Sequence, residues 1–538
     1  MPVGKFTVTI VSVCLLVAFA LHPAPGTDLV LKRVTTFHNN LSRQGVNTDE
    51  TVLRPANVNR QTFGKLFSQR VDGFVYAQPL FLTNVYIPRK GIHNVVFVVT
   101  EHDSVYAFDA DDDAGENRRP LWKTSFINPA LGITTATSND VGCGDIIPEV
   151  GVTGTPVIDT ASRTLYVVAK TRERGRFVQR LHALDIETGA EKSGGPVEIK
   201  AAVRGTGIAA KEELVTFDPL REHQRAGLLL QNGLVYVAWA SHCDNPPYHG
   251  WVMTYDVRTL RQTSVWNATP DGEMGGIWQS GAAPAGDGEN AYVSTGNGDF
   301  DVQRGGRDFG DSIIKLGMAP SGALAVTDYF TPYDEASLNA GDIEPGSGGT
   351  VLISAQGGRK HYVVNVSKSG TIYVVNPANM GQFNADGNHD VVQSIPSATG
   401  GVWGTPAWWN ETLYVAGSYD RLKAFRFDST AGRLAETPKS QSAIEFTYPG
   451  PTPAVSSNGR RDGIVWVVQA DAYVDGGSAV LRAFDAWDLS RELYSTDQAL
   501  ARDDPGRAVK FSVPTVVNGK VYVAAQDRVS VYGLLDLR

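Results

Sequence analysis

A short strand-and-turn pattern recurs along this chain of 538 residues. In its fullest form, a copy opens with a small residue and proline, continues through a hydrophobic-Tyr-Val strand and a turn, and ends in a strand that finishes near Asp. Self-similarity of this kind is typical of repeat architectures, in which each unit buries its faces against its neighbours. The copies run through residues 77–109, 154–185, 234–256, 291–316, 362–376, 404–425, 451–485 and 513–532.

The composition of each copy predicts the blade of a β-propeller, because three or four short strands alternate with turn residues. No long stretch with a helical period separates the copies, which disfavours βαβ units and a parallel sheet. The 56 glycines and 19 tyrosines agree with many turns and strands. The sequence therefore predicts an all-β chain that forms a single propeller of about eight four-stranded blades. A count of seven blades remains an alternative, because the fourth and fifth copies are loosely spaced.

The last copy stops after its third strand. Residues 63–70 are expected to supply the missing outer strand, which would close the ring and remove the free sheet edges. The predicted organisation is a signal peptide over 1–26, an N-terminal extension over 27–62 and the propeller over 63–538.

The first residues resemble an export signal. Lys5 gives a positive start, residues 6–20 form an apolar run, and Ala-Phe-Ala at 18–20 fits a cleavage site. The run is short for a membrane span, and no other stretch approaches its length. We therefore expect a secreted or periplasmic protein with no membrane span, whose mature chain starts between Leu21 and Asp28. The net charge of −9 argues against nucleic acid or an anionic membrane as partner.

Two cysteines, Cys143 and Cys243, remain once the predicted signal peptide with Cys14 is removed. An oxidising compartment would allow them to form a disulfide, although spacing alone does not fix the pairing. No C-x-x-C-H motif is present, so no covalent c-type haem is expected.

The repeats, with Ala-Phe-Asp at 107–109 and 483–485, resemble the quinoprotein alcohol dehydrogenase superfamily over nearly the whole predicted mature chain. In that family a segment ending in Gly-Asn carries a calcium ligand beside pyrroloquinoline quinone. Ser-Thr-Gly-Asn at 294–297 is similar, so the resemblance implies that Asn297 binds calcium. Gly-Gly-Ile-Trp at 275–278 looks like the family strand whose Trp stacks on the quinone, which gives Trp278 that role.

Three further segments carry the resemblance. Thr-Pro-Tyr-Asp at 331–334, followed by Asp342, looks like the region of the family's catalytic Asp. Ser-Lys-Ser-Gly at 367–370 resembles the segment that places a cation near the quinone carbonyl, here Lys368. The loop holding Asp244, ahead of Gly-Trp-Val at 250–252, stands where the family has a Glu that binds calcium.

Three departures from the family accompany these matches. Cys143 stands where adjacent cysteines form a ring-shaped disulfide over the cofactor, but Gly144 replaces the second cysteine. The basic residue that holds a quinone carboxylate is not visible in 145–151. An acidic residue before the first blade is replaced within Tyr-Ala-Gln at 76–78.

The resemblance implies a dehydrogenase that uses pyrroloquinoline quinone and calcium, oxidises an alcohol or a sugar, and passes electrons to an external acceptor. A hard cation with oxygen ligands would polarise the quinone carbonyl, and a carboxylate would take the alcohol proton. The implied site comprises the metal ligands Asp244, Asn297 and Asp342, the base Asp342 or Asp334, the cation Lys368, and the cofactor contacts Trp278, Lys368 and Cys143.

Other interpretations stay open. Each Asp taken singly fits a turn cap, Trp278 fits a packed blade residue, and Lys368 fits an exposed turn. At the level of function, the alternatives are a cofactor-free propeller that binds a protein or glycan, and a propeller that keeps the metal for different chemistry.

Overall fold

The strands of the repeats pair in chain order into eight antiparallel sheets, which are the blades of a β-propeller. The structure, a computed structural model, describes residues 1–4, 32–358 and 360–536. Most of the predicted signal peptide therefore lies outside the described residues. The prediction of an all-β propeller with eight blades is confirmed, and the seven-bladed alternative is wrong.

The four strands of each of the first four blades run from the channel outward. They are β4 (Leu80–Ile87), β5 (Gly91–Thr100), β6 (Ser104–Asp109) and β7 (Trp122–Ser125); β10 (Val157–Asp159), β11 (Thr164–Glu173), β12 (Arg176–Asp185) and β13 (Val197–Glu198); β17 (Leu229–Gln231), β18 (Leu234–Ser241), β19 (Trp251–Asp256) and β20 (Gln262–Asn267); β21 (Ala285–Gly286), β22 (Ala291–Ser294), β23 (Ile313–Met318) and β24 (Leu324–Phe330).

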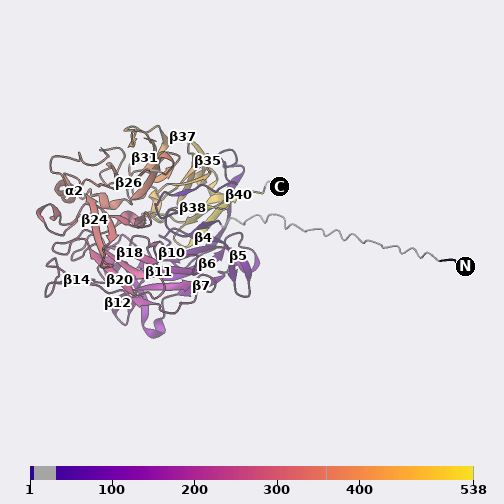
Figure 1. Cartoon of the computed structure of the whole chain (residues 1–538), viewed down its shortest axis with the longest axis horizontal. Coiled ribbons are helices and arrows are strands. Elements are labelled where there is room, and N and C mark those ends of the chain that lie inside the picture. The colour runs from indigo at the N-terminus through magenta and orange to yellow at the C-terminus, as the bar shows by residue number, and fades with distance from the viewer. Residues whose placement is uncertain (5–31, 359, 537–538) are drawn as a thin grey trace. The chain divides into compact units, whose positions relative to one another are not determined.

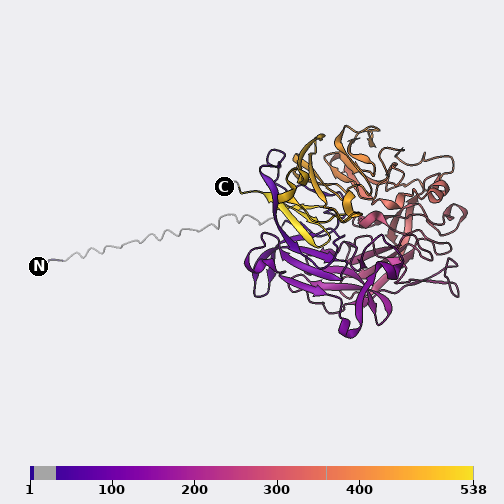
Figure 2. The same ribbon diagram turned by 180° about the vertical axis from the view of Figure 1, so that it is seen from behind.

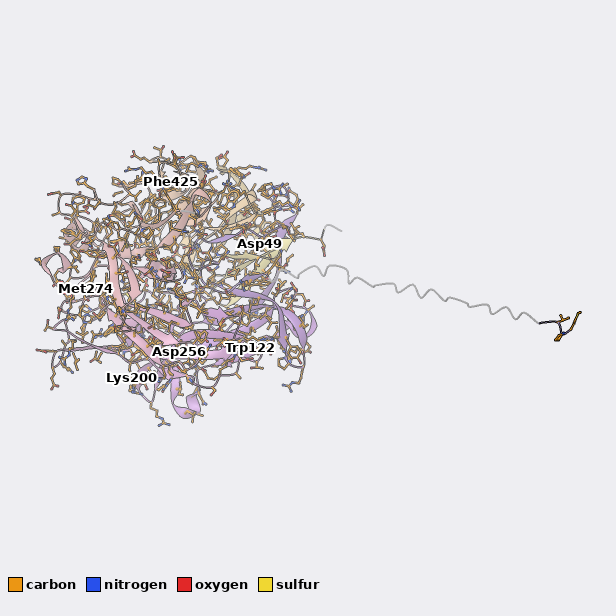
Figure 3. All side chains as sticks on the ribbon, in the orientation of Figure 1. Asp49, Trp122, Lys200, Asp256, Met274 and Phe425 are labelled. Atoms are coloured by element: carbon orange, nitrogen blue, oxygen red, sulfur yellow. A yellow bond between two sulfur atoms is a disulfide. The ribbon has the colours of Figure 1, made fainter. Side chains whose placement is uncertain are left out.

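Blades five to eight follow the same plan. They are β25 (Val351–Ala355), β26 (Lys360–Val366), β27 (Ile372–Val375) and β28 (Gln393–Ile395); β29 (Ala407–Trp409), β30 (Thr412–Ala416), β31 (Asp420–Asp428) and β33 (Ser440–Phe446); β34 (Ala454–Asn458), β35 (Arg461–Gln469), β36 (Val480–Asp485) and β37 (Asp488–Ser495); β38 (Thr515–Val517), β39 (Lys520–Ala524), β40 (Arg528–Leu534) and β3 (Phe63–Arg70). Asp256 of blade three and Phe425 of blade six lie on opposite sides of the ring (Figure 3).

The middle strands read as continuous apolar runs because both faces of a blade are covered by its neighbours. In β18, every residue after Leu234 is buried. The core is divided between adjacent blades: one apolar cluster joins Tyr166 and Val168 of blade two to Val237 and Trp239 of blade three. The core therefore lies between blades, and each blade depends on two others.

The ring closes as the sequence predicts. Strand β3 pairs antiparallel with β40, from Phe63 opposite Leu534 to Arg70 opposite Arg528. A strand that precedes the first blade in sequence is therefore the outer strand of the last blade, visible where indigo and yellow strands lie side by side (Figures 1 and 2).

Residues 35–45, which we term the channel strap, run along the inner strands of most blades. The strap is flanked by β1 (Arg33–Val34), which pairs with β4, and β2 (Val46–Asn47), which pairs in parallel with β34. Main-chain N–H groups at the second position of five inner strands donate to strap carbonyls. The pairs are Ile158 to Thr35, Gly286 to Leu41, Leu352 to Ser42, Trp408 to Gln44 and Val455 to Gly45, at 2.7–2.9 Å.

Arg43 anchors the strap and is fully buried. Its guanidinium donates to Thr36 Oγ1 at 2.6 Å, to the carbonyls of Phe37 and Asn40 within the strap, and to those of Pro284 and Leu228 in the flanking blades. The strap thereby satisfies inner-strand groups that would otherwise face the channel unpaired.

The short helices and the remaining strands lie outside the regular blade plan. They are α1 (Ser138–Val141), α2 (Glu335–Gly341) and α3 (Leu500–Asp503), with β8 (Ile133–Thr137), β9 (Glu149–Val150), β14 (Ala202–Arg204), β15 (Leu214–Thr216), β16 (Glu222–His223) and β32 (Arg433–Leu434). Within the described part of the chain, no helix has the length and apolar character needed to cross a bilayer.

Candidate cofactor site

A cavity of about 150 Å³ lies at one end of the propeller, among loops that emerge on the same side. Antiparallel pairing sends the loop inside each blade's central hairpin and the loops between blades to one end. Three predicted site residues line the cavity, namely Asp244, Trp278 and Lys368. Residues that sequence reasoning did not select also line it: Asp145, Arg225, Cys243, Ser280, Glu344, Ser347, Trp403, Tyr448 and Phe511.

Asp342, Asn297 and Lys368 meet although they come from three separate loops. Asn297 Nδ2 donates to Asp342 Oδ1 at 2.8 Å, and Lys368 Nζ lies 2.6 Å from the same oxygen. Asp342 follows α2, labelled in Figure 1, in a left-handed conformation with φ of 52°, and its side chain is 62% exposed. The structure therefore brings together the predicted base, cation and one predicted metal ligand, with the carboxylate open to solvent.

Asp244 lies on the same side of the cavity. Tyr248 donates its hydroxyl to Asp244 Oδ1 at 2.5 Å. Burial raises the pKa of Asp244, and the negative charge of Asp342 adds to this, while the Tyr248 hydrogen bond and Lys368 oppose it. The residue is thus electrostatically linked to the Asp342–Lys368 pair.

Two glycines of the predicted motifs make room for the Trp278 indole. A Cβ at position 276 would lie 3.1 Å from Trp278 Nε1, and one at position 296 would lie 3.2 Å from Trp278 Cδ1. Side chains at these positions would displace the ring, so the two motif glycines are needed for the indole to pack here. The half-buried indole presents an aromatic surface to the cavity.

Glu344 is a site residue that sequence reasoning missed. Its carboxylate is 6% exposed, and Oε2 lies 3.6 Å from Lys368 Nζ without accepting a hydrogen bond from any described residue. Burial raises the pKa of Glu344 to about 7, Lys368 opposes the rise, and Asp342 and Asp244 add to it. The sequence offered one indication of its role, namely its position two residues after Asp342. The loop that holds it has no repeating pattern that would have singled it out.

A further buried carboxylate, Asp311, stands behind this group. Neither of its side-chain oxygens has a hydrogen-bond partner among the described residues. Burial raises its pKa well above the ordinary value, and the charges of Glu344, Glu335 and Asp342 reinforce the effect. This end of the cavity therefore gathers several carboxyl groups around the cation Lys368.

The opposite end of the cavity is basic. Arg225 Nη1 donates to Asp145 Oδ2 at 2.8 Å, and Lys510 pairs with the other Asp145 oxygen. Both cations are buried, and each also lies over the ring of Phe511. Burial alone would raise the pKa of Asp145, but Arg225 and Lys510 outweigh it and hold the pKa well below its ordinary value.

These two cations lie beside Asp145, although the sequence has no basic residue at 145–151. Arg225 comes from the loop between blades two and three, and Lys510 from the loop between blades seven and eight. Neither lies near the motif in sequence, and only the closed ring places both beside Asp145.

A disulfide joins Cys143 to Cys243, which are 100 residues apart in the chain and have their Cα atoms 5.7 Å apart. Cys143 is buried with Val141, Ile146 and Val150, whereas Cys243 is exposed and lines the cavity. Cys143, the predicted cofactor contact, thus lies on the side of the disulfide away from the cavity. Its partner Cys243 faces the cavity.

Asp334, the second candidate base, lies just before α2 and is half-buried. Its main-chain carbonyl accepts hydrogen bonds from Ser337 and Leu338 at the start of the helix. Neither Asp334 nor Asp342 is among the residues that line the cavity, but Asp342 contacts the lining residue Lys368 at 2.6 Å, so the geometry favours Asp342 as the group that meets a ligand.

The structure is similar to solved dehydrogenases. A quinohemoprotein alcohol dehydrogenase from Comamonas testosteroni shares 13% identity and a TM-score of 0.57, over 93% of this chain and 80% of that one. A quinohemoprotein alcohol dehydrogenase from Pseudomonas putida HK5 shares 14% identity and a TM-score of 0.59, with the same coverage. A europium-containing methanol dehydrogenase shares 12% identity and a TM-score of 0.60, over 94% of this chain and 98% of that one.

The chain has the propeller fold of the quinoprotein alcohol dehydrogenases. No family model matches the sequence, and no curated protein matches it. At these identities, the likeness between this propeller and the solved dehydrogenases is one of fold. The function has to be argued from the cavity.

Proposed function

We propose that the protein is an exported dehydrogenase that uses pyrroloquinoline quinone and calcium to oxidise an alcohol or sugar, and passes the electrons to a separate acceptor. The observation that carries the proposal is the contact of Asn297 and Lys368 with one oxygen of Asp342, on a cavity lined by Asp244 and Trp278. A largely buried lysine and a buried amide that converge on one exposed carboxylate beside a cavity mark it as a candidate functional site.

The acidic end fits a hard cation. Asn297 Oδ1, Glu344 Oε2 and both oxygens of Asp311 are buried without hydrogen-bond partners among the described residues. Such oxygens are costly unless a cation or a proton compensates them, and amide and carboxylate oxygens are the ligands that calcium prefers. In the described part of the chain, no three acidic, histidine or cysteine side chains form a complete cage. Asp244, Asn297 and Asp342 would therefore hold the ion together, with Asn297 Oδ1 as the unpartnered oxygen among them.

The basic end fits a polyanion. Arg225 and Lys510 share one carboxylate, so the pair retains a net positive charge in a buried place. A planar cofactor with several carboxylates would find cations at this end, the Trp278 ring along its face and the cation site at the other end. The separation of charge across one cavity supports this orientation.

When bound, the quinone supplies the hydride acceptor and the calcium ion polarises its carbonyl. Asp342, exposed to solvent and in contact with the cavity residue Lys368, accepts the proton of the substrate hydroxyl at a carboxylate oxygen. Lys368 orients this carboxylate through its 2.6 Å contact. Trp278 would offer the cofactor an aromatic surface, and the Asn297 amide holds Asp342 through its 2.8 Å hydrogen bond to the same oxygen.

The test adds pyrroloquinoline quinone and calcium to the purified protein and follows absorbance and a dye-linked alcohol assay. We expect retained quinone and dye reduction, with both retention and activity lost in Asn297→Ala. Asp342→Asn should retain quinone but lose activity. Asp334→Asn serves as the matched control and should keep both the quinone and the activity. If the wild-type protein retains no quinone at micromolar concentration, the proposal is wrong.

A second function is favoured by the aromatic side of the cavity. Trp403 and Tyr448 have ring centroids 5.0 Å apart, and Phe511 lies 6.4 Å from Tyr448. Rings of this kind also bind the apolar faces of sugars. A protein that binds no quinone but retains an oligosaccharide, with binding lost in Trp403→Ala, would be a glycan-binding propeller.

A further inference from the structure

The Cys143–Cys243 disulfide stands between the two charged ends of the cavity. Cys243 directly precedes Asp244 of the acidic end, and Cys143 stands two residues before Asp145 of the basic end. The main-chain N–H of Asp145 also donates to Cys143 Sγ at 3.4 Å. One covalent bond is therefore coupled to a charged residue at each end.

The backbone around Cys243 is held in an unfavourable conformation. Cys243 and Asp244 have φ values of 53° and 48°, so two consecutive residues other than glycine lie in the left-handed region. Such residues persist when their surroundings fix them. The disulfide fixes the first, and the Tyr248 hydroxyl fixes the second.

Few other contacts join the two loops. Asn245 Nδ2 donates to the Gly142 carbonyl at 3.1 Å, and this hydrogen bond is exposed. It is a weak link compared with a covalent bond. The Cys243 side of the disulfide is open to the cavity, so a small reductant can reach it.

We propose that Cys143 and Cys243 are positioning residues, whose disulfide sets the loops of Asp145 and Asp244 and so makes ligand binding at both ends of the cavity dependent on the oxidation state of this bond. The part that concerns ligands rests on the proposed function, whereas the part that concerns the loops does not. With the bond intact, both loops keep their charged side chains at the cavity. With the bond reduced, residues 142–146 and 242–246 are released together.

The loop part is tested without any ligand by amide hydrogen exchange on the protein before and after reduction with a water-soluble phosphine. We expect exchange of 142–150 and 242–249 to accelerate at least tenfold, while β11 and β18 stay protected. The Cys143→Ser/Cys243→Ser variant should reproduce the change, and Asn245→Ala, which removes the other link, should cause a smaller one. Unchanged exchange in both loops would overturn the proposal. If the double variant fails to fold, reduction of the folded wild-type protein at low temperature still decides the outcome.

The ligand part is tested by titrating calcium and pyrroloquinoline quinone into oxidised and reduced protein. We expect the dissociation constant of each to rise at least tenfold on reduction. Equal affinities in the two states would overturn the coupling. If the oxidised protein binds neither ligand, the proposed function is wrong, and hydrogen exchange alone still decides whether the disulfide positions the loops.

Discussion

Lys368 lies between Asp342 and Glu344, where it offsets part of the negative charge at the acidic end of the cavity. The same lysine lies 5.9 Å from the centroid of the Trp403 ring, so its ammonium is held on two sides. A charge in this place has two opposite effects. It assists a reaction that develops negative charge beside it, and it repels a cation that would bind to the same carboxylates.

We therefore expect Lys368→Met to lower kcat of the reconstituted protein about 100-fold, the scale for removing one preorganised electrostatic contact. Calcium affinity should rise in the same variant, because one repulsive charge is gone. Lys368→Arg keeps the charge and should retain part of the activity. Dye-linked turnover and calorimetric titration of calcium measure the two quantities separately. A fall in both would contradict the assignment of Lys368 to the acidic end.

The buried Glu101 makes the stability of the ligand-free protein depend on pH. It is 1% exposed, and its Oε2 accepts hydrogen bonds from Gly151 N and Thr153 Oγ1 at 2.8 and 3.0 Å. Burial nevertheless raises its pKa from 4.5 to about 7. The folded state therefore holds the proton more tightly than the unfolded chain, so this contribution to stability is complete below the unfolded pKa and is lost as pH rises through about 7.

The expected result is a fall in the free energy of unfolding between about pH 5 and pH 8, of which Glu101 supplies about 3 kcal/mol. Glu101→Gln should flatten the profile by that amount in urea unfolding at stepped pH, whereas the exposed Glu212→Gln should leave it unchanged. A profile of the same steepness in Glu101→Gln would show that the carboxyl is solvated.

Individual residues were predictable from the sequence where they belong to a motif. Asn297, Trp278 and Lys368 stand in segments with glycines beside them, and the glycines at 276 and 296 are needed for the indole to fit. Arg225, Lys510 and Glu344 could not be found in this way. Each lies in an inter-blade loop, and its role depends on which loops the ring brings together.

At the scale of elements, the blades were predictable and the channel strap was not. A blade strand shows itself as an apolar run between turn signals, repeated at each copy. Residues 35–45 have no such pattern, because their carbonyls bind main-chain N–H groups whatever the side chains are. Arg43 is the one strap residue for which we argue a role of the side chain itself. Its buried guanidinium needs the five acceptors that the strap and the flanking blades supply.

Replacing Arg43 should be costly for this reason. Arg43→Leu leaves several buried acceptors without donors, and we expect a loss of about 3 kcal/mol or more in the free energy of unfolding. Arg43→Lys, which can satisfy part of the set, should lose less. Thermal and urea unfolding measure the difference. An unchanged midpoint in Arg43→Leu would mean that water replaces the guanidinium.

At the scale of the whole molecule, the sequence predicts that residues 63–70 close the ring, and the structure shows this closure. Blade eight draws three strands from the end of the chain and one, β3, from its beginning. Removing residues 526–538 should leave β3 without a partner and open blade eight, so we expect loss of cooperative unfolding and of the monodisperse folded species. Removing 536–538 alone is the control and should have little effect. Circular dichroism and size-exclusion chromatography distinguish these outcomes, and a cooperative fold without 526–538 would contradict the closure argument.

The joining of first and last strands also governs when the protein can fold during its synthesis. The strap and β3 leave the ribosome before the first complete blade, yet their partners in blades seven and eight arrive more than 400 residues later, from Val455 to Arg528 onward. Contacts of such long sequence separation form slowly. Until the last blade is complete, the nascent chain is a row of stacked sheets with an open edge at each end, exposed to proteases and to pairing with other chains. The slowest step of maturation is therefore expected to be the docking of the earliest segment onto the latest.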